Sequence, residues 1–166
     1  MTPAQAADFM AVLPGSEADE ILALIEPDDA RKVRNLLEHH EDKIADFATK
    51  HFISFPADTE IRRVLNQYRS RAKRADVVSY VYAVGEDNKL LGVMDIKELL
   101  RADPSERMAD QMTTNLVMLT AESTIKEATK LFARYSFRAI PVVDDKEAIT
   151  GVIPYRDVME LKHQYV

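Results

Sequence analysis

Apolar residues recur every three or four positions in two separate stretches of the chain, and this spacing predicts two amphipathic helices. The positions are Ile61, Val64, Leu65 and Tyr68 in one stretch, and Ile125, Ala128, Leu131, Phe132 and Tyr135 in the other. Glu127 stands three residues after Thr124, which is the spacing of a capping box. We therefore expect Thr124 or Ser123 to cap the second helix.

Shorter apolar runs flank each helix and predict strands. One run precedes each helix, at 51–55 and at 116–119, and two runs joined by a polar turn follow it. The pairs that follow are 77–84 with 90–94, and 138–143 with 148–153. A second helix is expected at 96–101 and again from 155 to about 163. The predicted order is strand, helix, strand, strand, helix, and it occurs twice.

The two copies align with each other as an internal repeat. Residues 55–64 match 119–128 at a spacing of 64, whereas residues 84–93 match 143–152 at a spacing of 59. The first copy therefore has five extra residues, which we place in the polar stretch 69–76. Neither copy is large enough to bury both faces of its sheet, so the two are expected to share a core, with a ligand site in the cleft between them.

The first forty residues have a different pattern, with short apolar faces interrupted at 14–16 and at 26–27. This pattern predicts a string of short helices, as in part of a helical solenoid, too small to form a good core alone. The expected fold class is α+β. A short-helix segment at 1–42 precedes a first repeat at 43–103 and a second repeat at 104–166.

Composition excludes several classes of function. The net charge of −6 and the pI of about 5.3 argue against nucleic-acid binding, which needs a basic face. The absence of cysteine excludes thiolate catalysis and cysteine zinc sites. No arrangement of nucleophile, base and orienting group is suggested, so we do not expect an enzyme. No signal peptide is recognisable, and no apolar run reaches the roughly 20 residues that span a bilayer, so the chain is expected to be soluble.

Both repeats contain short characteristic motifs. The second copy contains Ala139-Ile140-Pro141-Val142-Val143-Asp144 followed by Gly151-Val152-Ile153, and the first contains Tyr82-Ala83-Val84 followed by Leu91-Gly92-Val93. These runs resemble CBS repeats. The helical stretch contains Pro27-Asp28-Asp29-Ala30 and Val33-Arg34-Asn35-Leu36-Leu37, and Arg107-Met108-Ala109-Asp110-Gln111-Met112-Thr113 opens the second copy. With these, the chain is similar to the soluble region of MgtE-type magnesium transporters, with a shortened helical N-terminal domain.

This resemblance implies a homodimer formed through the CBS pairs, on the cytoplasmic side of the cell membrane, joined to a transmembrane pore domain of the same full-length chain. Magnesium ions between acidic faces would keep the assembly compact and the pore closed. When the magnesium concentration falls, the carboxylates repel each other and the pore opens, since oxygen ligands suit this ion. The implied function is to sense intracellular Mg²⁺ and gate ion passage.

The resemblance places metal-binding acids at Asp157 and Glu160, three residues apart on one helix, and at Asp8. Other positions at which the family pattern has acids differ in this chain. They are occupied by Thr124, Lys126 and Ser136, and the last six residues are Leu161-Lys162-His163-Gln164-Tyr165-Val166.

The alternative function is a free-standing CBS-pair protein that senses adenine nucleotides and regulates a partner. CBS pairs of that kind carry Gly, two apolar residues, Ser or Thr, two further residues and Asp. In the second copy Gly151 and Asp157 are present, but Pro154 replaces the hydroxyl residue and has no N–H. In the first copy Asp95 stands there and would repel a phosphate.

Tyr80 and Phe137 are candidates to flank an adenine ring, and Asp157 to hold the ribose. A third possibility is a dimerisation scaffold without a ligand. The basic run Arg69, Arg71, Lys73 and Arg74 is interpreted either as a solvated loop or as a contact for anionic lipid or a partner.

Overall fold

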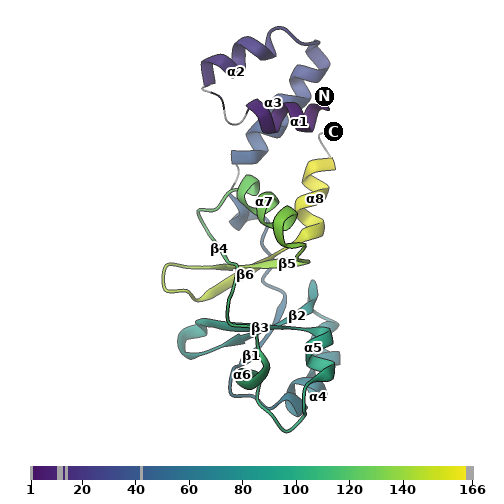
Figure 1. Ribbon diagram of the computed structural model, residues 1–166, viewed down its shortest axis with the longest axis vertical. Coiled ribbons are helices and arrows are strands. Elements are labelled where there is room, and N and C mark those ends of the chain that lie inside the picture. The colour runs from purple at the N-terminus through teal and green to yellow at the C-terminus, as the bar shows by residue number, and fades with distance from the viewer. Residues whose placement is uncertain (1, 11–12, 14, 42, 164–166) are drawn as a thin grey trace.

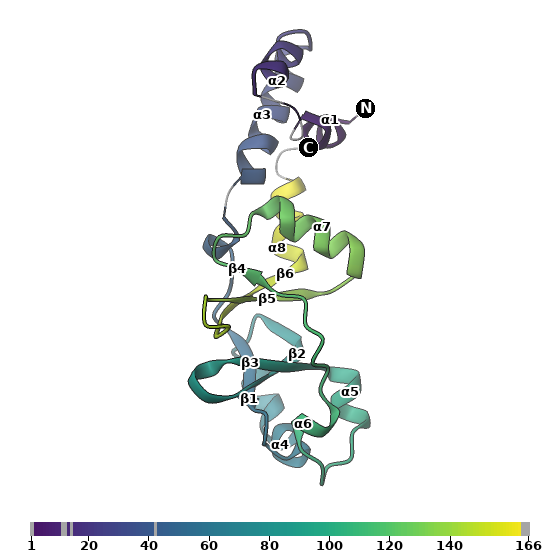
Figure 2. The same cartoon turned by 60° about the vertical axis from the view of Figure 1, so that its left-hand side comes forward.

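The computed structural model describes residues 2–10, 13, 15–41 and 43–163. The molecule is elongated, with a helical segment at one end and two small sheets stacked below it (Figures 1 and 2). The N-terminal segment consists of α1 (Pro3–Met10), α2 (Gly15–Leu22) and α3 (Pro27–Glu41). The expected short helices are thus present.

The helical segment has a small core of its own. The buried residues are Ala6, Ala7, Met10, Ala18, Leu22, Ala30 and Val33. Four of these seven are alanine, so the helices approach closely but bury little apolar area per residue. Because α3 also packs against α7 of the second repeat, the segment is joined to the rest of the molecule by contacts as well as by the chain.

The predicted order of elements occurs twice. The first repeat contains β1 (Phe52–Pro56), α4 (Ile61–Ala72), β2 (Val77–Val84), β3 (Leu90–Asp95) and α5 (Ile96–Arg101). The second contains β4 (Leu119–Thr120), α7 (Ile125–Tyr135), β5 (Ala139–Val143), β6 (Ile149–Pro154) and α8 (Tyr155–His163). The short helix α6 (Met108–Gln111) and the 3₁₀ turns η1 (Ile44–Asp46) and η2 (Glu86–Asn88) complete the list. The α+β fold class is confirmed.

The two sheets have the same strand order and equivalent pairing of residues. In each sheet the first two strands are parallel and the last two antiparallel, in the order β1-β2-β3 and β4-β5-β6. Tyr80 pairs with Asp95 in the first sheet, and Ala139 pairs with Pro154 in the second, which is the same register displaced by 59 residues. Both antiparallel ladders also shift register at the equivalent step, so the two sheets share even this irregularity.

The five extra residues of the first copy are not all in the stretch 69–76, where we expected them. Phe52 pairs with Val77 but Ile53 pairs with Val81, so three extra residues are accommodated within β2. One more lengthens α4 relative to α7, and one lengthens the loop that follows. A polar stretch need not be a loop: α4 continues to Ala72, and half of the basic run therefore lies on a helix.

Each repeat begins with a lead-in segment that packs on the other repeat. Ile44, in the lead-in segment of the first repeat, is fully buried in the core of the second, and Met108, 64 residues later, is fully buried in the core of the first. The backbone N–H of Ile44 donates to Ser123 and that of Met108 donates to Thr59, both at 3.0 Å. The lead-in segments, 43–49 and 107–113, thus cross over symmetrically. The domain boundaries expected before residues 43 and 104 stay predictions.

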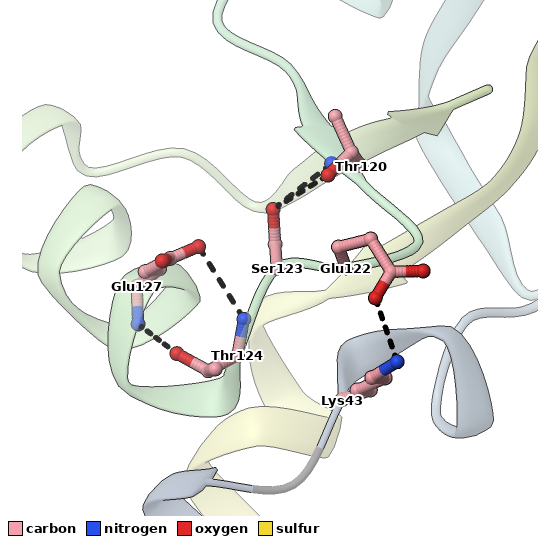
Figure 3. Close-up of polar contacts among 6 residues, drawn as sticks. All are labelled: Lys43, Thr120, Glu122, Ser123, Thr124 and Glu127. Carbon is pink, nitrogen blue, oxygen red and sulfur yellow. Dashed lines mark hydrogen bonds and ion pairs between the residues drawn. The ribbon is translucent and has the colours of Figure 1, made fainter. Parts of the chain in front are cut away.

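The crossing is continued at the edge of each sheet and at the start of α7. Thr49 exchanges backbone hydrogen bonds with Val152 at 2.8 and 2.9 Å, and Thr113 does so with Val93 at 3.0 and 2.9 Å. Figure 3 shows the start of α7, where Lys43 contacts Glu122 at 2.6 Å. Thr124 caps α7 in a capping box with Glu127, as its spacing predicts.

Candidate functional site

The two sheets face each other across a shared apolar layer, which contains the cleft expected between the repeats. A cavity of about 70 Å³ lies in this layer. It is lined by Tyr80, Tyr82, Val93, Thr113, Asn115, Leu116, Val117, Phe137, Ala139 and Pro141. Tyr80 and Phe137, the two aromatic residues proposed to flank an adenine, are thus brought to one cavity.

Tyr82, one of the residues that line the cavity, has a hydroxyl without a hydrogen-bond partner. The hydroxyl of Tyr82 is buried and makes no hydrogen bond, the one such side-chain atom among the described residues. Burial raises the pKa of Tyr82 far above its usual range, and the neighbouring Tyr80 adds to the effect. A buried donor without an acceptor costs about 1–3 kcal/mol, so this hydroxyl lowers the stability of the folded chain.

The cavity is small for a nucleotide. Ligand pockets usually measure about 300–1,000 Å³, several times the volume found here. Tyr80 is also held in place, because its hydroxyl accepts a hydrogen bond of 3.3 Å from the backbone N–H of Arg138. An adenine ring would enter only if the lining side chains moved apart.

Asp157, the third residue proposed for the nucleotide, is not among the residues that line this cavity. It lies in the first turn of α8. In the corresponding motif of the first repeat, Asp95 occupies the position at which nucleotide-binding CBS pairs have Ser or Thr. In the structure Asp95 is instead the N-cap of a helix. The Asp95 carboxylate accepts a hydrogen bond of 2.7 Å from the backbone N–H of Glu98 and caps α5.

Arg138 is a candidate that the sequence analysis missed. It lines one surface hollow with Asp76 and Arg156, and another with Asp95 and Lys97. The second hollow shares Tyr80 with the cavity between the repeats. A guanidinium at such a place can bind a phosphate or carboxylate in a bidentate manner. Its place immediately after Phe137, at the start of a predicted strand, was the available signal.

The proposed metal ligands lie on α8, one helical turn apart. Asp157 is half-buried and Glu160 is exposed. Burial raises the pKa of the Asp157 carboxyl, the charges of Glu160 and Asp76 add to this, and Arg156 opposes it. Asp76 itself accepts a hydrogen bond of 2.5 Å from the Thr49 hydroxyl. The carboxylates of Asp157 and Glu160 on α8 and of Asp76 in the loop before β2 therefore influence one another electrostatically, and a bound cation would stabilise them.

The donor set fits a water-rich magnesium site better than a protein cage. Among the described residues no three His, Cys, Asp or Glu side chains are grouped so as to hold a metal. Mg²⁺ keeps several waters and is often bound by only one or two carboxylates, which Asp157 and Glu160 can supply. The side chain of Asp8, the third proposed ligand, lies outside the described residues.

The described parts of the chain include no helix that is both long and apolar enough to cross a membrane. A family model described as "CBS domain" matches residues 44–105 and 108–163. These two matches cover well over half of the chain and coincide with the two structural repeats.

Magnesium transporter MgtE from Thermus thermophilus is 28% identical over 138 residues, which are 83% of this chain and 31% of that protein. The chain therefore spans about a third of this relative. The fold resembles the crystal structure of the soluble part of a magnesium transporter, with a TM-score of 0.71 and 22% identity over 99% of this chain and 64% of that one. It also resembles the cytosolic domain of the Mg²⁺ channel MgtE in complex with ATP, with a TM-score of 0.71 and 25% identity over 97% and 66% of the two chains.

Proposed function

We propose a regulatory function for this chain, which belongs to the CBS domain family. In this proposal it is the cytoplasmic, Mg²⁺-sensing part of an MgtE-type magnesium transporter and gates ion passage through a transmembrane pore domain. Residues 1–42 are then part of the helical N-terminal domain of such a protein. A sensor of this kind needs no catalytic group.

The observation that carries the proposal is that the likeness to magnesium transporters extends beyond the repeats. The similar cytosolic domain of MgtE covers 97% of this chain, which includes most of the N-terminal helices as well as the pair of repeats. A CBS pair alone would not require a helical segment in this place. The order of helices, first repeat and second repeat therefore favours a transporter sensor over a free-standing pair.

The physical basis of sensing is repulsion between carboxylates. Burial raises the pKa of Asp157, the charge of Arg156 lowers it, and the charges of Glu160 and Asp76 raise it by smaller amounts. A bound Mg²⁺ offsets that repulsion, and it shifts a conformational equilibrium only as far as it binds one state better than the other. In both views α8 points toward the N-terminal helices, so an ion on α8 is well placed to bias how they dock (Figures 1 and 2).

A homodimer is part of the proposal. Leu100 on α5, Tyr135 on α7 and Tyr155 on α8 are large apolar side chains left 68%, 41% and 45% exposed. Helices α5 and α8 occupy equivalent places in the two repeats, and a second copy could cover both. The full-length transporter would bring the two copies together below the pore.

The test is a thermal melt and a sedimentation run with and without millimolar Mg²⁺, with Ca²⁺ in parallel. A ligand that binds only the folded state raises the melting temperature. We expect stabilisation or compaction by Mg²⁺ that is lost in Asp157→Asn/Glu160→Gln. The matched control is Glu86→Gln/Asp145→Asn, which removes the same charge from two exposed hairpin turns. An equal Mg²⁺ response in both double variants would contradict the proposed site.

The Asp157 carboxyl also gives the test a pH dependence. A folded-state pKa raised above the unfolded value contributes stability that is present below the unfolded pKa and is lost as the pH rises through the folded pKa. We expect Asp157→Asn to stabilise the metal-free protein at neutral pH and to reduce the loss of stability between acid and neutral pH. Saturating Mg²⁺ should produce a similar reduction in the unsubstituted protein.

Adenine nucleotide binding is a second candidate, favoured by the shared cavity of Tyr80 and Phe137 and by the similar MgtE domain described in complex with ATP. The same melts with AMP or ATP in magnesium-free buffer test it. Stabilisation that is lost in Phe137→Ala supports a nucleotide in the cleft. A response to nucleotide alone, with none to Mg²⁺, would favour the nucleotide sensor over the magnesium sensor.

A further inference from the structure

Positive charge is concentrated on α4, although the chain as a whole is acidic. Residues 61–74 contain six basic residues and no acidic one, leaving 16 basic against 28 acidic residues elsewhere. Helix α4 lies at the end of the molecule opposite the N-terminal helices, away from the acids of α8 (Figures 1 and 2). The basic cluster therefore lies in the first repeat, whereas the proposed magnesium ligands of α8 lie in the second.

A groove of about 510 Å³ opens along this helix, from Arg63 to Arg71. It is lined by Phe55, Pro56, Asp58, Thr59, Glu60, Arg63, Gln67, Arg71 and Arg107. Three of these are arginines, and they come from two parts of the chain: Arg63 and Arg71 from α4, and Arg107 from the lead-in segment of the second repeat. The volume is within the range of about 300–1,000 Å³ that is usual for small-molecule sites.

Two of the three guanidinium groups are held in fixed orientations. That of Arg71 lies 3.9 Å from the centre of the Phe55 ring and donates to the Ser54 carbonyl at 2.7 Å and to Gln67 Oε1 at 3.2 Å. That of Arg107 donates to the Asp58 carbonyl at 2.5 Å. A guanidinium has five N–H donors, so both groups keep donors for a ligand. Their orientation is set in advance, which lowers the entropy cost of binding.

These arginines have no carboxylate partner in the described parts of the chain, where every ion pair within 4.0 Å involves other residues. The carboxylates of Asp58 and Glu60 line the groove and are exposed, so three positive charges face two negative ones. The N-terminal N–H groups of α4 are not available, because those of Ile61 and Arg62 already donate to Glu106 and Pro104. Binding of an anion in the groove would therefore depend on the guanidinium groups and not on the N-terminus of α4.

At the equivalent place in the second repeat, the corresponding side chains contact other residues of this chain. Lys43, the counterpart of Arg107, contacts Glu122 at 2.6 Å. Glu127, the counterpart of Arg63, closes the capping box with Thr124 (Figure 3). In the second repeat both side chains are therefore engaged, Lys43 with Glu122 and Glu127 with Thr124. In the first repeat the corresponding side chains are cationic and face the groove.

We propose that this groove is a binding site for a phosphate-bearing anion, separate from the cleft between the repeats and from the acids of α8. Paired guanidinium groups match phosphate oxygens in charge and in bidentate geometry. The phosphate is that of a small soluble phosphate or of a lipid headgroup, which have the same chemistry at this site. The proposal does not depend on magnesium sensing.

The experiment uses the full 166-residue chain in magnesium-free buffer containing a chelator. Inorganic phosphate and pyrophosphate are titrated by calorimetry. Co-sedimentation with phosphatidylcholine vesicles, with or without phosphatidic acid, tests the lipid source. We expect Arg63→Gln/Arg107→Gln to weaken binding of the preferred probe more than about tenfold, because each substitution removes charged hydrogen-bond donors from the groove.

The matched control is Arg62→Gln/Arg69→Gln, which removes the same charge from α4 at positions outside the groove and should change binding by less than about twofold. Because Arg107 donates a hydrogen bond to the Asp58 carbonyl, its substitution could destabilise the fold. The single variant Arg63→Glu leaves that contact in place, and a melting temperature equal to that of the unsubstituted protein shows that it is folded. It should also lose binding. Equal loss in the groove and control variants, or no binding of phosphate, pyrophosphate or vesicles, would overturn the proposal.

Discussion

At the scale of single residues, two tyrosines of the first repeat differ in how their hydroxyls are satisfied. The Tyr82 hydroxyl is buried without a partner, whereas the Tyr68 hydroxyl donates to the Val78 carbonyl at 2.5 Å. A net hydrogen bond contributes about 0.5–1.5 kcal/mol, and an unsatisfied buried group costs about 1–3 kcal/mol. The same chemical change should therefore have opposite effects at the two positions.

We expect Tyr82→Phe to increase the free energy of unfolding by about 1 kcal/mol, and Tyr68→Phe to decrease it by about the same amount. Urea unfolding followed by circular dichroism measures both. A loss of stability in Tyr82→Phe would mean that the hydroxyl makes a hydrogen bond in solution, and would contradict its unsatisfied state.

At the scale of elements, the helices of the two repeats begin differently. Thr124 caps α7 with a capping box, whereas Glu60 stands before α4 without a side-chain hydrogen bond of that kind. The N–H groups at the start of α4 donate instead to the carbonyls of Pro104 and Glu106, in the connection between the two repeats. Helix α7 therefore depends on its local sequence and α4 on a long-range contact.

We expect Thr124→Ala to lower the free energy of unfolding by about 1 kcal/mol, which is typical of a lost helix cap. Thr124→Ser, which keeps the hydroxyl, is the control and should lose much less. Denaturant unfolding distinguishes them. Equal losses in the two variants would show that the methyl group, rather than the cap, stabilises this helix.

At the scale of the whole molecule, the crossed lead-in segments tie the repeats together. Gly151 shows how close the crossing is, since a Cβ there would lie 3.1 Å from the Ala48 Cβ and 3.2 Å from the Thr49 carbonyl oxygen. Gly92, at the equivalent place in the first repeat, would place a Cβ 2.6 Å from the Met112 Cγ. Both glycines leave room for the lead-in segment of the other repeat, and this close approach explains why glycine stands at the equivalent position of each repeat.

The crossing predicts that a change in the first repeat's lead-in segment destabilises the second repeat. Ile44→Ala should lower the free energy of unfolding by about 2–5 kcal/mol and reduce hydrogen-exchange protection in α7 and β5. The control is Leu24→Ala, because Leu24 is 85% exposed. Unchanged protection of α7 and β5 in Ile44→Ala would contradict a shared cooperative unit.

The order of elements, the twofold repeat and the cap of α7 could all be predicted from the sequence. Each depends on short-range geometry: helical faces repeat every three or four residues, strands pair between nearby runs, and a capping box spans three residues. The same reasoning placed the five extra residues in a polar stretch. It was wrong in part because polarity does not distinguish an exposed helix such as α4 from a loop.

The amino-acid sequence by itself determined the two α+β repeats, their relation to CBS domains, and the candidate residues Tyr80, Phe137, Asp157 and Glu160. Only the tertiary structure decided which of these meet, because contacts across 60 or more residues leave no local pattern in the chain. It brought Tyr80 and Phe137 to one cavity and left Asp157 outside it, and it crossed the lead-in segments. It also gathered Arg63, Arg71 and Arg107 around one groove, because the packing of the second lead-in segment on the first repeat places distant side chains together.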